Sequence, residues 1–205
     1  MQILSHRGYW REPAEKNSRA AFARTLEAGF GTETDVRDLA GQLVVSHDPP
    51  TGGEMAWSEL LAMFEGSGLP LAVNVKSDGL APQLLEAFAQ STTPWFAFDM
   101  SGPQTAVFAR TGLPFYTRHS DVEPQPILYS DAAGVWLDSF TDDQWIRPDL
   151  ILRHLEAGKA VCVVSSELHG REPGRLWDRL AELRGEARVT LCTDRPEEAK
   201  AALDL

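Results

Sequence analysis

The chain has 205 residues, of which 43% are hydrophobic and 24% charged, with a formal net charge of −11. This length predicts one domain over residues 1–205 with a sizeable core. The acidic balance argues against nucleic acid as a partner, because such a face is normally basic. No apolar run could span a bilayer, and the N-terminal residues lack the pattern of a secretory signal. We therefore expect a cytoplasmic protein without stable membrane insertion, whose oligomeric state stays open.

Short β-rich runs alternate with helix-like runs along the whole chain, each bounded by Gly, Pro, Asp or Asn. The expected strands are 2–5, 31–36, 69–76, 95–100, 114–118, 134–139, 160–165 and 188–193. The expected helices are 18–28, 57–65, 80–90, 103–111, 149–157, 173–184 and 196–203. Asp194 is the expected N-cap of the last helix, with Pro196 in its first turn. Residues 39–46 predict a small hairpin after the second strand, with Gly41 in its turn.

Eight strands with intervening helices amount to about 26 residues per unit, which is enough for a compact α/β fold of the (β/α)8 TIM-barrel type. An open, doubly wound sheet is the alternative, but no Gly-rich phosphate loop follows the first strand. Polar residues gather at the C-terminal ends of the strands, where the active sites of such barrels lie. Cys162 and Cys192 lie in apolar strand-like runs and are expected to be reduced core thiols.

Glu33 and Asp35 are two residues apart in an expected strand, so their side chains share one face. Carboxylates roughly 7 Å apart repel unless positive charge lies between them, and a divalent cation such as Mg²⁺ or Ca²⁺ would supply it. The alternative is a solvated strand end that pairs with Arg37 or Lys76. Asn74 and Lys76 repeat the spacing on the next strand. Asn74 could offer the same cation an oxygen, while Lys76 could hold an anionic substrate or pair with Glu33.

His6 and His47 each follow a strand beside this carboxylate pair, which suits acid–base chemistry on a metal-bound substrate. Arg7 adds a bidentate donor suited to phosphate, and Gly8 permits close backbone approach. His154 and His169, in contrast, are expected to be structural or surface residues.

The remaining candidates follow later strands. Arg118 could contact a phosphate, or it could form an ion pair with Asp99 or Asp121. Trp136 and Asp138 share a face, and Trp136 either packs in the barrel or stacks on a substrate. Asp99 and Asp138 are possible additional site carboxylates.

Several motifs together resemble the glycerophosphodiester phosphodiesterase family, within the superfamily of phosphatidylinositol phospholipase C-like phosphodiesterases. They are His6-Arg7-Gly8, Glu15-Lys16-Asn17-Ser18, Glu33-Thr34-Asp35-Val36 and Val44-Val45-Ser46-His47-Asp48. Asn74-Val75-Lys76 stands where that family has Glu-x-Lys, and Thr193-Asp194-Arg195-Pro196 looks like its closing motif. The resemblance covers nearly the whole chain.

The resemblance implies a (β/α)8 barrel that hydrolyses a small-molecule glycerophosphodiester to glycerol phosphate and an alcohol, with one divalent cation. It implies that His6 and His47 are the acid–base pair and that Glu33 and Asp35 are metal ligands. It also implies that Arg7 and Lys76 bind the phosphate.

The chain departs from the family pattern in three places. Asn74 replaces a glutamate, which predicts weaker metal binding. The segment after His47 is short, which predicts a more open active face. The expected seventh strand ends without an aromatic residue. Two alternatives therefore stand beside the main hypothesis: another substrate, such as a lysophospholipid or a cyclic or sugar phosphodiester, and a non-catalytic barrel that binds a phosphate ligand.

Overall fold

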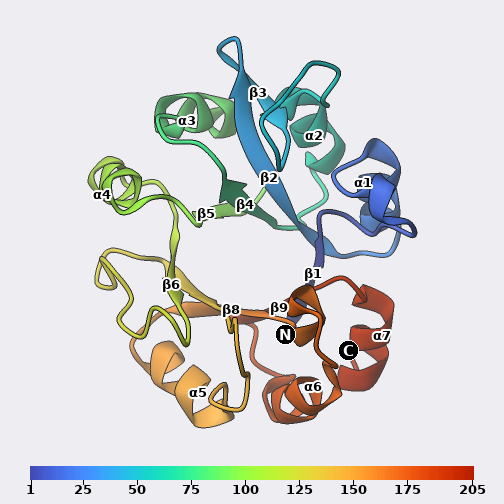
Figure 1. The fold of residues 1–205 in the computed structure, drawn as a ribbon, viewed down its shortest axis with the longest axis vertical. Coiled ribbons are helices and arrows are strands. Elements are labelled where there is room, and N and C mark those ends of the chain that lie inside the picture. Colours follow the sequence, from blue (N-terminus) through green and yellow to red (C-terminus); the bar gives the residue numbers. More distant parts are fainter.

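Eight parallel strands form a nearly closed barrel in the computed structural model, which describes residues 1–205 (Figure 1). The barrel strands are β1 (Gln2–His6), β2 (Gly31–Leu39), β4 (Leu71–Val75), β5 (Trp95–Phe98), β6 (Tyr116–His119), β7 (Gly134–Leu137), β8 (Ala160–Val164) and β9 (Val189–Thr193). They are hydrogen-bonded in the order β5-β4-β2-β1-β9-β8-β7-β6. A parallel bridge between Ala97 and Phe115 joins the two end strands. The expected TIM barrel is therefore confirmed over the doubly wound sheet.

Seven helices surround the barrel, one after every barrel strand except β6 (Figure 1). They are α1 (Arg19–Glu27), α2 (Trp57–Phe64), α3 (Ala81–Ala89), α4 (Gly102–Thr111), α5 (Pro148–Glu156), α6 (Gly174–Leu180) and α7 (Pro196–Leu203). Three short 3₁₀ turns are η1 (Pro13–Glu15), η2 (Ser166–His169) and η3 (Ala181–Leu183). Residues 120–133 connect β6 to β7 without a helix.

The predicted hairpin is present. Strand β3 (Gln42–Val45) runs antiparallel to β2, with Leu39 opposite Gln42. The two residues between them, Ala40 and Gly41, have φ angles of 50° and 81°. Positive φ at both central positions is the geometry of a tight hairpin turn, and glycine adopts it without strain.

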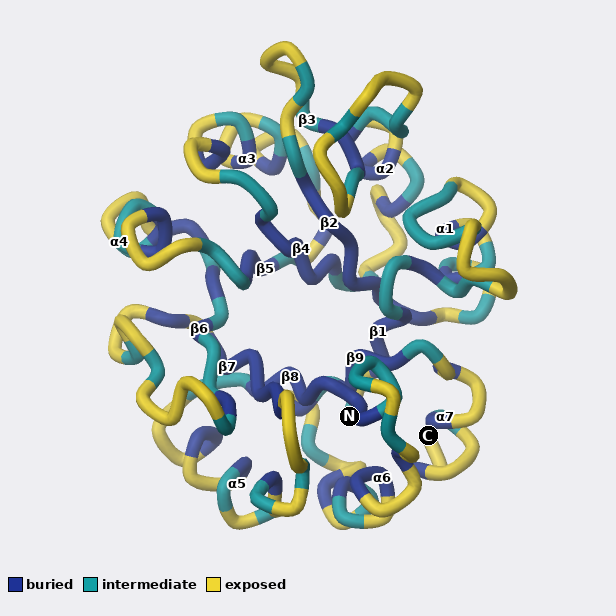
Figure 2. Tube along the Cα trace, in the orientation of Figure 1, coloured by how far each residue is buried: buried dark blue, intermediate teal, exposed yellow.

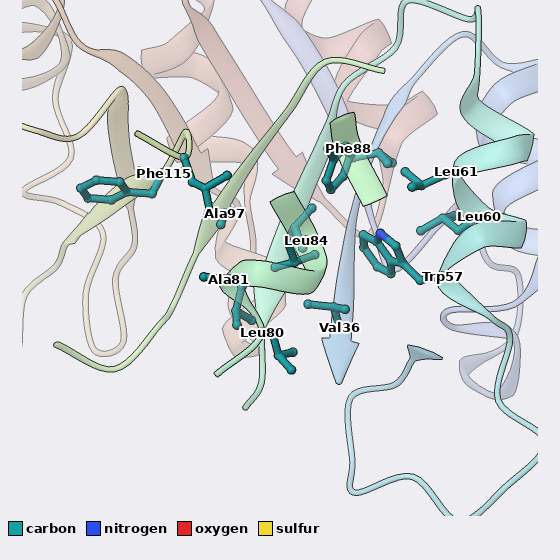
Figure 3. Close-up of a cluster of buried hydrophobic side chains, with 14 of the residues drawn as sticks. Val36, Trp57, Leu60, Leu61, Leu80, Ala81, Leu84, Phe88, Ala97 and Phe115 are labelled. Carbon is teal, nitrogen blue, oxygen red and sulfur yellow. The ribbon is translucent and has the colours of Figure 1, made fainter. Parts of the chain in front are cut away.

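Buried residues follow the barrel strands (Figure 2). The apolar side chains form two shells. The outer shell lies between the strands and the helices, as in the cluster around Trp57 and Leu84 of α2 and α3 (Figure 3). The inner shell fills the barrel and is drawn from its strands: Leu4, Ala72, Phe96, Phe98, Trp136, Cys162, Val164 and Cys192. Phe98 stacks on Trp136 with ring centroids 3.7 Å apart. Because the inner shell fills the barrel interior, a ligand can approach only at the ends of the barrel.

Both cysteines belong to the inner shell, are fully buried and form no disulfide. Burial raises the pKa of both thiols. The expectation of core thiols is confirmed.

The N-cap prediction for the last helix is wrong. Helix α7 begins at Pro196, as expected, but its N-cap is Arg195 and not Asp194. The carboxylate of Asp194 is hydrogen-bonded to His6 of β1 instead. His6, which lies 188 residues away in the sequence, takes up the Asp194 carboxylate that would otherwise cap the helix.

Candidate functional site

The C-terminal ends of the barrel strands place most of the predicted polar residues on one face. Glu33 and Asp35 lie in the barrel part of β2, before this strand continues into the hairpin with β3, and their relative exposures are 1% and 0%. In the register of the sheet, Glu33 is the partner of His6 on β1, and Asp35 is the partner of Asn74 on β4. Burial, followed by the negative charge of Asp35, raises the pKa of Glu33 to about 7. The two carboxylates therefore form a buried pair that calls for nearby positive charge.

Three side chains contact Asp35. Arg7 Nε lies 2.9 Å from its Oδ2, Lys76 Nζ lies 3.4 Å from its Oδ1, and Asn17 Nδ2 donates to Oδ2 at 2.8 Å. Lys76 thus pairs with Asp35 and not with Glu33. Asn17 also accepts a hydrogen bond of 2.9 Å from Thr34 Oγ1, which fixes its amide. No role was predicted for Asn17, because only the fold brings it to the carboxylate.

The oxygen atoms at this end of β2 and β4 fit a divalent cation. Asp35 Oδ1 and Asn74 Oδ1 are both buried and neither has a hydrogen-bond partner. They belong to register partners on adjacent strands, and Glu33 lies two residues from Asp35 on the same face. Carboxylate and amide oxygens are the ligands that Mg²⁺ and Ca²⁺ prefer. No three His, Cys, Asp or Glu side chains lie together as a metal-binding group. A cation site here would therefore depend on the Asn74 amide oxygen as well as on the carboxylates.

His6 is held by Asp194 from the end of β9. Its Nδ1 lies 2.7 Å from Asp194 Oδ1, and its Nε2 lies 3.8 Å from Glu33 Oε2. Burial would raise the pKa of Asp194, but the hydrogen bond to His6 and the charges of His6 and Lys16 outweigh it, so that pKa is lowered. Glu167 accepts a 3.0 Å hydrogen bond from the backbone N–H of Asp194. The Asp194 carboxylate therefore orients the ring and leaves Nε2 facing the carboxylate pair.

The backbone after His6 is pressed against α1. Arg7 and Gly8 have φ angles of 57° and 83°. A Cβ on Gly8 would lie 2.7 Å from the Cβ of Ala21, so only glycine fits at this position. The backbone N–H of Arg7 donates to the backbone oxygen of Glu33 at 2.9 Å. These contacts hold the backbone of Arg7 and Gly8 in place at the end of β1.

His47 lies apart from the carboxylate pair. Its side chain is 43% exposed, and its Nδ1 is 2.9 Å from Asp48 Oδ1. Arg37 Nε donates to its backbone oxygen at 2.9 Å. His47 and Arg7 line the same open cavity of about 600 Å³. Arg7, which lines this cavity with His47, also contacts Asp35 of the carboxylate pair.

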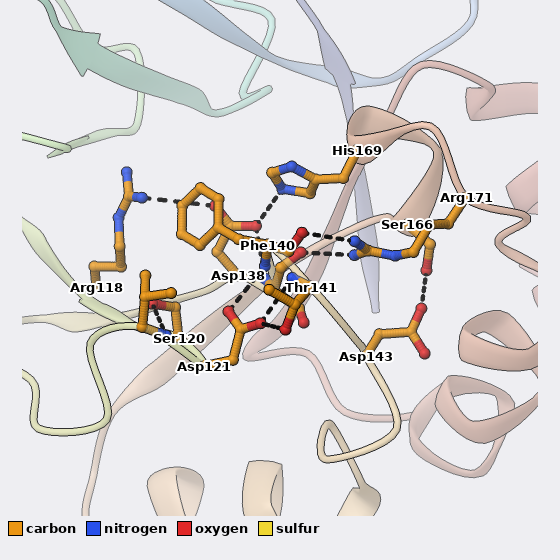
Figure 4. A network of polar contacts seen from close by, with 12 residues as sticks. Arg118, Ser120, Asp121, Asp138, Phe140, Thr141, Asp143, Ser166, His169 and Arg171 are labelled. Carbon is orange, nitrogen blue, oxygen red and sulfur yellow. Dashed lines mark hydrogen bonds and ion pairs between the residues drawn. The ribbon is translucent and has the colours of Figure 1, made fainter.

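The ends of β5 to β8 carry a second polar group (Figure 4). Arg118 pairs with Asp99, with Nε 3.1 Å from Oδ1, and its guanidinium also lies 3.8 Å from Asp138 and 3.4 Å from Glu123. The predicted alternative of an ion pair with Asp99 is therefore present. Asp121 does not pair with Arg118. It accepts hydrogen bonds from the backbone of Phe140 and Thr141.

Three further residues of this half have clear positions. Trp136 is only 4% exposed and stacks on Phe98 in the inner shell, which favours the packing alternative. His154 is buried between His119 and Tyr129, so its structural role is confirmed. His169, expected to be a structural or surface residue, is partly buried, and its Nε2 lies 2.7 Å from Asp138 Oδ1 at the barrel mouth. Its position in a polar loop gave no signal of this contact.

Comparisons with known proteins bear on the fold. No protein-family model matches the chain, and no curated protein sequence matches it. Among solved structures, the crystal structure of a glycerophosphodiester phosphodiesterase from Parabacteroides distasonis is similar, with a TM-score of 0.72 and 18% identity. The match covers 99% of this chain and 96% of that chain. The two chains share a fold. The structure also has no helix with the length and apolar character needed to span a membrane.

Proposed function

We propose that this protein is a metal-dependent phosphodiesterase that converts a glycerophosphodiester to glycerol phosphate and an alcohol. The observation that carries the proposal is the group at the ends of β1, β2, β4 and β9. This group combines the oriented ring of His6 with the buried carboxylates of Glu33 and Asp35. It also contains the unpartnered amide oxygen of Asn74 and the cationic side chains of Arg7 and Lys76. The fold shared with a glycerophosphodiester phosphodiesterase supports it.

The acid–base work falls to His6 and His47. With Nδ1 hydrogen-bonded to Asp194, His6 can accept a proton at Nε2 from the glycerol hydroxyl beside the phosphate. That hydroxyl oxygen forms a bond to phosphorus, and the bond to the departing alcohol breaks as His47 donates a proton to its oxygen. Water then opens the resulting cyclic phosphodiester to glycerol phosphate, with the proton transfers reversed. The open cavity at His47 gives the leaving alcohol a path to solvent.

Arg7 and Lys76 would bind the non-bridging phosphoryl oxygens. Both side chains already face the carboxylate of Asp35, so they lie beside the oxygen atoms that would hold the cation. A divalent cation held by Glu33, Asp35 and Asn74 would stabilise negative charge on the phosphoryl oxygens. The two side-chain cations then keep the phosphate within reach of His6.

A panel of glycerophosphodiesters, assayed for release of glycerol phosphate with Mg²⁺, Ca²⁺ or Mn²⁺, tests this function. We expect release that EDTA abolishes, and a loss of about 10²-fold or more in the His6→Ala and His47→Ala variants. His154→Gln is the matched control, because His154 lies outside the site. Metal binding without hydrolysis of any diester would overturn the proposal and favour a non-catalytic phosphate-binding barrel.

A further inference from the structure

The second polar group at the barrel mouth takes no part in the chemistry proposed above. Asp138 follows β7, two residues after the inward-facing Trp136, and its side chain is only 7% exposed. Arg118 and His169 approach its carboxylate from opposite sides, with the ring of Phe140 beside them (Figure 4). A buried carboxylate held in this way at the mouth of a barrel is positioned to contact a ligand.

Hydrogen-bonding capacity remains on each of these side chains. Asp138 Oδ1 accepts from His169 Nε2 at 2.7 Å and from the Ser139 backbone N–H at 2.8 Å. Asp138 Oδ2 has only the Arg118 guanidinium, at 3.8 Å, which is too far for a hydrogen bond. In the neutral tautomer that donates from Nε2, the Nδ1 atom of His169 is an acceptor. Two acceptors and the guanidinium donor therefore face the mouth together.

The charges favour a neutral ligand. Asp99, Glu123 and Asp138 surround the single guanidinium of Arg118, so a second anionic group would meet net negative charge. Although burial would lower the pKa of Arg118, these carboxylates raise it, so the guanidinium stays charged. A cationic ligand could reach the carboxylates only by displacing this guanidinium. Hydroxyl groups avoid both conflicts, because each can donate to a carboxylate and accept from a guanidinium.

Phe140 adds an apolar surface to the group. Its side chain is 37% exposed, and its ring lies 5.1 Å from the His169 ring centroid and 5.1 Å from Arg118 Cζ. We propose that Arg118, Asp138, His169 and Phe140 form a subsite for a polyhydroxyl group, through which the enzyme prefers diesters of a polyol over diesters of a simple alcohol. The inference rests on the proposed phosphodiesterase function. The hydroxyls bind the polar atoms, and the carbon backbone of the polyol packs on Phe140.

Two substrates that differ only in hydroxyl groups test the subsite: glycerophosphoglycerol and the glycerophosphodiester of 1-propanol. We expect the wild-type protein to favour the first by about tenfold in kcat/KM, as two or more added hydrogen bonds would give. His169→Phe and Asp138→Asn should reduce this ratio toward one. His154→Gln, the control, should leave the ratio unchanged. A wild-type ratio near one, or variants that lower both rates while keeping the ratio, would overturn the inference.

Binding measurements keep the subsite separate from catalysis. Calorimetric titration of both diesters into the His6→Ala protein should show the same preference for the polyol diester, and His6→Ala/His169→Phe should lose it. If the wild-type protein hydrolyses neither diester, the proposed function fails. The same titration of the wild-type protein then decides the subsite alone, and equal affinity for the two diesters would refute it.

Discussion

Asn74 is the residue that most distinguishes the candidate metal site. Its amide Oδ1 is buried without a partner beside Asp35, while its Nδ2 donates weakly to Asp99 at 3.5 Å. An amide oxygen carries no net charge, so the site attracts a 2+ ion less strongly than three carboxylates would. The sequence alone predicts the missing charge, but it does not reveal that Asn74 Oδ1 is buried without a hydrogen-bond partner next to Asp35.

We expect Asn74→Glu to bind Mg²⁺ or Ca²⁺ about tenfold or more tightly, because the added charge lies beside the cation. Calorimetric titration of the metal measures this directly, and Asn74→Gln serves as the control because it adds length without charge. Equal affinity of the glutamate and glutamine variants would show that Asn74 does not face the ion.

Asp194 should matter to turnover rather than to stability. Asp194→Asn keeps the shape of the side chain but removes the carboxylate charge that orients the His6 ring through Nδ1. We expect kcat to fall at least about tenfold with little change in KM or in the midpoint of urea denaturation. Steady-state kinetics and an unfolding curve provide both measurements. A large stability loss with unchanged kcat would assign Asp194 a purely structural role.

The elements themselves were largely predictable from the sequence. Most barrel strands are short β-rich runs bounded by turn residues, and those local signals suffice to locate them. Contacts between distant elements carry no such signal. The pairing of His6 with Asp194, the contact of Asn17 with Asp35, and the pairing of His169 with Asp138 all join residues from separate βα units. These contacts arise only when the barrel closes, so local patterns cannot reveal them.

At the junction of β1 and α1, close packing leaves room only for glycine at position 8. Gly8→Ala should cost about 2–4 kcal/mol, because a left-handed φ and a clash with Ala21 add together. Gly29→Ala is the matched control. Its φ is 74°, but a Cβ there meets no atom within 4 Å, so we expect a loss of only about 1 kcal/mol. Urea denaturation compares the two variants, and equal losses would contradict the packing argument.

For the whole molecule, the buried His154 makes folding sensitive to acid. Burial, followed by the charges of His119 and Arg153, lowers the pKa of His154 to about 4. The unfolded chain binds a proton at His154 near pH 6.5 and the folded protein does not, so acid favours the unfolded state and the free energy of unfolding falls as the pH falls. Stability should be fully present above about pH 6.5 and decline by about 2 kcal/mol as the pH falls to about 4.

Urea denaturation at several pH values measures this decline, and His154→Gln should flatten it between pH 6.5 and 4. The glutamine can still donate and accept hydrogen bonds beside Tyr129 and His119. A variant whose stability falls as steeply as that of the wild-type protein would locate the acid sensitivity elsewhere.

The barrel brings its buried carboxylates, Glu33, Asp35 and Asp138, together with Arg7, Lys76 and Arg118, to one end, next to the apolar inner shell. The most direct test of its role is the release of glycerol phosphate from glycerophosphodiesters, measured with and without EDTA in the wild-type and His6→Ala proteins. We predict release that requires a divalent cation and that falls about 10²-fold or more without the His6 side chain. Full activity in His6→Ala, or release unaffected by EDTA, would contradict the account.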